Sequence, residues 1–119
     1  MNSESASDQR IAAMSFAKVY PLYRAKVERK GRSQAELDQV IGWLTGLDAA
    51  RLEALRAEGA SFAQLFEEAR LNPRAALITG VICGIRVEEI ANPLTQKVRW
   101  LDKLVDELAK GRAMEKVLR

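Results

Sequence analysis

The sequence predicts an all-α protein, a compact single-domain bundle of five or six helices around a buried central helix, and three observations support this class. Apolar residues recur at helical spacing, as at Phe16, Val19, Tyr20, Tyr23 and Val27. Ser, Asp or Asn precedes most of these runs, where a helix needs a side-chain cap. Glycine follows several of them, where a helix commonly ends. The 119 residues suffice for one hydrophobic core.

The first element that we expect is a flexible N-terminal tail over residues 1–13. This segment is rich in Ser, Ala and Asp and has little large apolar content. A single helical domain is expected to occupy residues 14–119. Its first helix follows the tail and stops at Gly31. Pro21 interrupts the pattern, so this helix either kinks at the proline or begins there.

Two further helices and a weaker helical unit are predicted between residues 33 and 69. Ser33 and Glu36 have the spacing of a capping box, in which each side chain satisfies a backbone donor of the other residue. The helix that they open ends at Gly46. A shorter unit is expected over residues 48–58, and a second capping box at residues 61–64 opens the next helix.

Residues 73–84 are predicted to form the central helix. Asn72 and the proline after it resemble a helix start, and the segment is apolar nearly all round. Gly80 and Gly84 would then stack on one face and admit a neighbouring helix, unless the second glycine is the helix stop. Cys83, the only cysteine, is predicted to be a small buried residue rather than a reactive thiol.

The longest predicted helix covers residues 93–110, and a short helix follows Gly111. Its apolar residues alternate at spacings of four and three, which is typical of a heptad seam about two heptads long. One interpretation is a helix that packs against its own domain, and the other is a dimer seam. The candidate self-association face consists of Leu94, Val98, Leu101, Leu104, Val105 and Leu108.

The composition excludes several chemistries. With no histidine and one cysteine, the chain has neither a histidine-based catalytic triad nor a histidine- or cysteine-rich metal site. The glycines do not form a phosphate-binding loop. We therefore expect no metal and no cofactor. The sequence also lacks a signal peptide and a membrane-spanning apolar run, which predicts a cytoplasmic protein without membrane contact.

Several short segments resemble a known family. They are VYPLY (19–23), RKGR (29–32), WLTG (43–46), GVICGIRVE (80–88) and the stretch from residue 101 to the end. Together they resemble the bacterial family known as domain of unknown function 2200, from about Met14 to the last residue. The resemblance implies a small bacterial cytoplasmic protein, with Met14 as an alternative start. It implies no reaction and no catalytic residues.

Three classes of function remain open. We expect a non-enzymatic protein-interaction module, either a homodimer or a binder of another protein. The second class is nucleic-acid binding, because the net charge is +3 and residues 97–119 hold seven basic against four acidic side chains. Most of these basic residues have acidic neighbours within a turn, as solvated helix faces do.

The third class is a small-ligand-binding protein or an enzyme. Arg86 would hold an anionic group, and Glu88 would be the candidate base. The competing interpretation is a solvated turn after the central helix. The candidate residues for this site are Arg86, Glu88, Glu89, Tyr20 and Tyr23.

Overall fold

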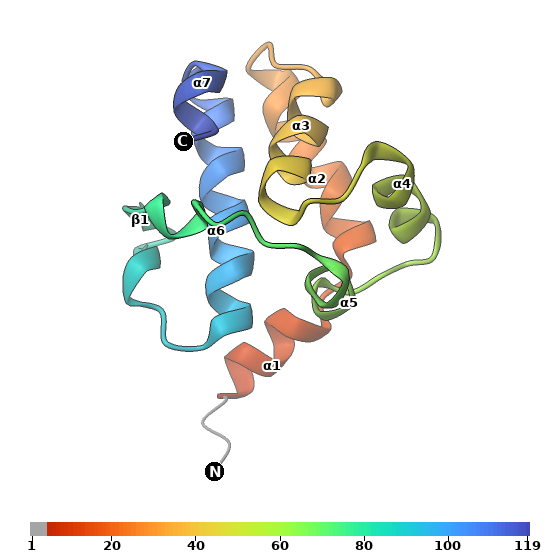
Figure 1. Ribbon diagram of the computed structural model, residues 1–119, viewed down its shortest axis with the longest axis vertical. Helices are drawn as coiled ribbons and strands as arrows, with labels where there is room; N and C mark the ends of the chain where they lie inside the picture. The colour runs from red at the N-terminus through yellow and green to blue at the C-terminus, as the bar shows by residue number, and fades with distance from the viewer. Residues whose placement is uncertain (1–4) are drawn as a thin grey trace.

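Helix α6 is the axis of the fold in the computed structural model, which describes residues 5–119 (Figure 1). Around it pack α1, α2, α3, α5, α7 and a small hairpin. Over that described range the α-helices are α1 (Ala6–Ala13), α2 (Phe16–Arg29), α3 (Gln34–Thr45), α4 (Ala49–Ala57), α5 (Phe62–Glu68), α6 (Pro93–Ala109) and α7 (Met114–Val117). Shorter elements are the 3-10 turns η1 (Ala75–Leu77) and η2 (Val87–Glu89) and the strands β1 (Val81–Ile82) and β2 (Ile85–Arg86). The all-α class is confirmed.

Side-chain caps begin the helices where the sequence predicted them. The Ser33 hydroxyl accepts from the Glu36 backbone N–H at 3.1 Å, and the Glu36 carboxylate accepts from the Ser33 N–H at 2.9 Å. Ser61 and Gln64 repeat this reciprocal pair at α5. The Asn92 side chain caps α6, and a proline occupies its first turn. These local signals therefore set the starts of α3, α5 and α6.

Helix α2 begins before its proline. The Ser15 hydroxyl accepts from the Lys18 backbone N–H at 3.1 Å and caps the helix at Phe16. Pro21 lies inside the helix, where it removes the backbone donor that would otherwise bond the Ala17 carbonyl. Of the two alternatives for this helix, a start at the proline is therefore wrong.

Part of the predicted N-terminal tail is a helix. Ser5 and Asp8 form a capping box that starts α1, and Asp8 Oδ1 accepts from the Thr95 hydroxyl of α6 at 2.6 Å. No residue of α1 is fully buried, so the apolar pattern of the segment gave no sign of a docked helix. The tail expectation is corrected for residues 6–13, and for residues 1–4 it lies outside the described residues.

The predicted central helix over residues 73–84 is wrong. The Asn72 side chain accepts from the Arg74 N–H, but only the single 3-10 turn η1 follows. The chain then forms an antiparallel hairpin in which Val81 pairs with Arg86 and Ile82 with Ile85. Because α6 takes the central position, the segment lies on the outside of the bundle beside it (Figure 1).

The two residues of the hairpin loop explain its geometry. Cys83 and Gly84 have φ values of 51° and 78°, both in the left-handed region that favours glycine. Gly80, with φ of 110°, also lies outside the helical region, so the two glycines do not stack on a helix face. Cys83 is exposed, which corrects the prediction that it is buried.

The apolar stripe of α6 is the core of the protein's own fold. Leu101, Leu104 and Leu108 are fully buried, Val98 and Val105 are nearly so, and Leu94 is partly buried against them. Of the two interpretations of this stripe, the one in which the helix packs against its own domain therefore agrees with the structure. The candidate self-association face is corrected, because its six residues are covered by the same chain. Within residues 5–119, no helix has the length and hydropathy that crossing a membrane requires.

Gly46, at the end of α3, gives a test of the local packing. Its φ is +71°, and an added Cβ would lie 2.8 Å from the Arg70 carbonyl oxygen. Gly46→Ala is expected to lower the free energy of unfolding by about 2 kcal/mol, because strain and a backbone clash add. Gly111→Ala is the matched control, since φ is +88° there but nothing lies within 4 Å of the added atom. Equal losses in urea unfolding of the two variants would contradict the clash.

Candidate functional site

Arg86 and Glu88, two of the charged residues predicted for a site, make their contacts within the hairpin segment. Arg86 and Glu88 form an ion pair at 3.6 Å, and Glu88 Oε1 accepts from the Gly80 backbone N–H at 3.0 Å. That backbone hydrogen bond is the main reason why the pKa of Glu88 lies below its usual value. Arg86, Glu88 and Glu89 are all exposed. The observed contacts of Arg86 and Glu88 are with their own segment, as expected of a solvated turn.

Tyr20 does not join this group. Its hydroxyl donates to Asp38 Oδ1 at 2.5 Å and accepts from Gln34 Nε2 at 3.0 Å. The Arg56 guanidinium lies 4.0 Å above the ring centroid. These partners belong to α3 and α4, so Tyr20 fastens those helices to α2.

Tyr23, by contrast, lies beside the hairpin. Its hydroxyl donates to Asp102 Oδ1 at 2.5 Å, and Asp102 Oδ2 accepts from Arg99 at 3.1 Å. Burial, followed by the Asp102 charge, raises the pKa of Tyr23 well above its ordinary value. This hydrogen-bonded chain fixes one wall of a pocket.

The pocket has a volume of about 240 Å³ and lies where α2, α6 and the hairpin meet. It is lined by Leu22, Tyr23, Lys26, Ile82, Cys83, Asp102 and Val105. Ile85 pairs with Ile82 across the hairpin and therefore lies on the same side of it. We call the surface formed by Leu22, Ile82, Cys83 and Ile85 the hairpin face.

The hairpin face exposes two large apolar side chains around the buried Ile82. Five large apolar side chains are exposed among the described residues, namely Met14, Leu22, Leu77, Val81 and Ile85. Leu22 and Ile85 belong to the face, with 67% and 46% of their surfaces exposed, and Val81 adds a third on the same hairpin. Leu22 was not predicted as a site residue, although a leucine outside the apolar stripe of a helix indicates an exposed apolar side chain.

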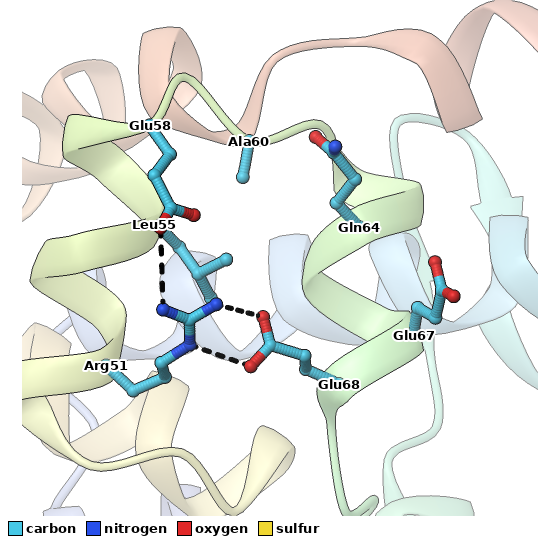
Figure 2. A pocket seen from close by; sticks show the side chains of 7 residues that line it. All are labelled: Arg51, Leu55, Glu58, Ala60, Gln64, Glu67 and Glu68. Carbon is cyan, nitrogen blue, oxygen red and sulfur yellow. Dashed lines mark hydrogen bonds and ion pairs between the residues drawn. The ribbon is translucent and has the colours of Figure 1, made fainter.

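A second, larger hollow lies between α4 and α5. Its volume is about 470 Å³, and the buried side chains of Leu55 and Ala60 contribute to its lining. Figure 2 shows Arg51 reaching across it to two carboxylates. Both oxygens of Glu68 accept from Arg51 at 2.7 Å, and Glu58 lies 3.6 Å from the same guanidinium. The bidentate pair joins the two helices.

The electrostatics of this hollow favour a cation over an anion. Hydrogen bonding to Glu68 raises the pKa of Arg51, and the same hydrogen bond lowers the pKa of Glu68. The lining has three acidic side chains, Glu58, Glu67 and Glu68, and one arginine, so its net charge is negative. Within residues 5–119 no cluster of three acidic, histidine or cysteine side chains has an arrangement that could hold a metal ion.

Comparison with known proteins identifies the family. The sequence model of a family described as an uncharacterized protein conserved in bacteria (DUF2200) matches residues 10–119. The chain belongs to this family. The match begins inside α1, four residues before the start of the resemblance seen in the sequence. A crystal structure of the uncharacterized protein SP1917 is similar, with a TM-score of 0.86 and 43% identity over 98% of this chain and 94% of that one. No curated protein matches the chain.

The raised pKa of Tyr23 predicts a pH dependence of stability at the pocket. A group whose pKa is higher in the folded state than its ordinary value of 10.0 stabilises the fold below pH 10. That contribution is lost as the pH rises above 10 towards the folded-state pKa. The free energy of unfolding of Tyr23→Phe is therefore expected to fall less steeply with rising alkaline pH than that of the parent protein.

Urea unfolding between about pH 8 and pH 11 measures this dependence. Tyr20→Phe is the comparison, because burial raises the pKa of Tyr20 less strongly, so this variant is expected to reduce the alkaline loss less than Tyr23→Phe does, and it leaves the Tyr23 hydrogen bond in place. If the Tyr23→Phe and parent curves run parallel through this range, Tyr23 does not cause the alkaline loss.

Proposed function

We propose that the protein is a non-enzymatic protein-interaction module that binds through the hairpin face. The observation that carries the proposal is the exposure of Leu22 and Ile85 around an apolar pocket of about 240 Å³. Exposed apolar patches beside a pocket are typical of protein-binding surfaces, where a few anchor side chains supply most of the affinity. Burying a fully exposed leucine contributes about 1.5–3 kcal/mol.

The nucleic-acid alternative receives less support from the charges. At least ten of the nineteen Lys and Arg side chains form ion pairs with carboxylates of the same chain. A surface that binds a phosphate backbone needs unpaired Lys or Arg side chains, which displace the counterions of the nucleic acid on contact. The small-ligand alternative at Arg86 and Glu88 is also weaker, because these two side chains pair with each other.

Photo-crosslinking in the native bacterial host tests the proposed function and captures a partner of any identity. A benzophenone amino acid in place of Leu22 is expected to give a covalent adduct with another polypeptide. The same amino acid in place of Met14 is the matched control, because Met14 is apolar and 46% exposed but is not part of the hairpin face. The proposal fails if position 22 gives no adduct or no more than position 14 does.

A further inference from the structure

Two lysines near the hairpin face make no ion pair with a carboxylate, unlike Lys26 in the pocket lining, which pairs with Asp106. Lys18 lies one helical turn before Leu22 on α2, is exposed and makes no ion pair within residues 5–119. Lys103 of α6 also has no carboxylate partner in that range. Its ammonium donates to the Val81 carbonyl at 3.2 Å, and its side chain lies across Gly80. The two elements that form the hairpin face, α2 and the hairpin, therefore each carry or contact one lysine that has no carboxylate partner in that range.

The acidic groups beside the same pocket already have cations. Asp102 accepts from Arg99 at 3.1 Å. Asp106 lies 3.2 Å from Lys26 and 3.0 Å from Lys110. Glu89, exposed just after the hairpin, makes no ion pair within residues 5–119. Two lysines therefore stand against one acid among the groups around the face that have no ion pair, and the remaining charge is positive.

We infer that the partner is an acidic protein segment that inserts one large apolar side chain into the pocket. This inference rests on the proposed function and adds the chemistry of the partner to it. The walls from Leu22, Ile82 and Val105 suit an apolar anchor, and a volume of about 240 Å³ suits one side chain. Asp or Glu residues on either side of the anchor reach Lys18 and Lys103. Such flanking charges speed association and select the partner.

A second copy of this chain fits the same surface less well. A symmetric contact between two hairpin faces would bring Lys18, Lys103 and the paired Lys26 of both copies together. The chain has a net charge of +3, so the repulsion is not offset by a general excess of acidic groups. The charge pattern therefore favours a different, acidic polypeptide.

Selection from a library of random peptides displayed on phage tests the chemistry of the partner. The whole chain is the bait, and Leu22→Lys is the comparison bait. The enriched peptides are expected to share one large apolar residue flanked by Asp or Glu, and to lose enrichment on the comparison bait. A basic or neutral consensus, equal enrichment on both baits or no enrichment overturns the inference.

Alkylation of Cys83 gives a direct readout of pocket occupancy. This thiol is the only one in the chain, is exposed and lines the pocket. The best selected peptide is expected to slow alkylation of Cys83, and added salt is expected to weaken its binding roughly tenfold. Lys103→Gln is expected to weaken binding several-fold, whereas Lys116→Gln on the exposed surface of α7 serves as the control. A peptide that binds without protecting Cys83, or equally to both lysine variants, overturns the inference.

The two proposals fail in different ways. A crosslink from position 22 to a second copy or to a partner without an acidic contact segment would support an interaction module but overturn the acidic-partner inference. The absence of a specific crosslink at position 22 would remove the proposed function as well.

Discussion

Leu101→Lys combined with Leu108→Lys is expected to abolish folding. Both leucines are fully buried in the core on α6. Truncating one buried leucine to alanine typically costs about 2–5 kcal/mol, and two buried ammonium groups add a desolvation penalty. A domain of this size is stable by about 5–15 kcal/mol, so the two changes together exceed what the fold can lose.

Circular dichroism and size-exclusion chromatography of the double variant measure this outcome. Helical signal is expected to be lost, and Leu101→Ala alone is expected to remain folded with a free energy of unfolding lower by about 3 kcal/mol. Leu22→Lys is the matched control, because the same chemical change at a 67% exposed site should alter stability by about 0.5 kcal/mol or less. A double variant that stays fully helical would show that the stripe is not the core.

Short-range chemistry explains which parts of the fold could be predicted from the sequence. The capping boxes at Ser33 and Ser61 depend on side chains three residues apart, so their partners are visible in the sequence. The same holds for Asn92 and the proline after it. The periodicity of α6 identified the correct buried face. It could not show whether the covering surface came from the same chain, because both alternatives require the same spacing.

The hairpin was missed because its stabilising contacts are not local in this way. A short apolar run has no period that separates a buried helix from a strand pair. The hairpin is held by Glu88 at the Gly80 N–H and by Lys103 at the Val81 carbonyl, and Lys103 comes from another element. The φ of 51° at Cys83 is also unusual for a residue that is not glycine. A composition-based interpretation would not place such a residue in the turn.

The candidate sites could not be predicted from the sequence for the same reason. The pocket joins Leu22, Ile82 and Val105, which come from three separate segments. The bidentate pair in the second hollow joins Arg51 and Glu68, seventeen residues apart on different helices. Of the five residues predicted for a site, only Tyr23 lines the pocket. Tyr20 contacts α3 and α4 instead.

Glu107→Ala is expected to release the C-terminal segment and to destabilise the whole domain. Glu107 is a buried acid on α6, with 6% of its surface exposed. Its carboxylate oxygens accept from both terminal nitrogens of Arg119 at 2.7 and 2.8 Å, and Arg112 lies 3.1 Å away. Removing the acid leaves the Arg119 guanidinium, whose side chain is 14% exposed, without its carboxylate. Breaking such a buried pair costs about 3–5 kcal/mol.

Urea unfolding and hydrogen exchange measure the two parts of this effect. Amide protons of α7 are expected to exchange faster in Glu107→Ala than in the parent protein, because the pair holds the residues after α7 against α6. Glu115→Ala is the matched control, since it removes an exposed glutamate from α7 itself. Similar stability losses in the two glutamate variants would contradict a special role for Glu107.

A double change separates the attraction of the pair from the penalty of one unpaired charge. Glu107→Leu combined with Arg119→Leu removes both partners, so it is expected to recover part of the stability lost in Glu107→Ala. Arg112 is left without this acid in both cases, but its side chain is 43% exposed and remains hydrated. Recovery in the double variant would show that most of the loss comes from stranding the Arg119 charge. Without recovery, the attachment of α7 depends on the attraction between Glu107 and Arg119.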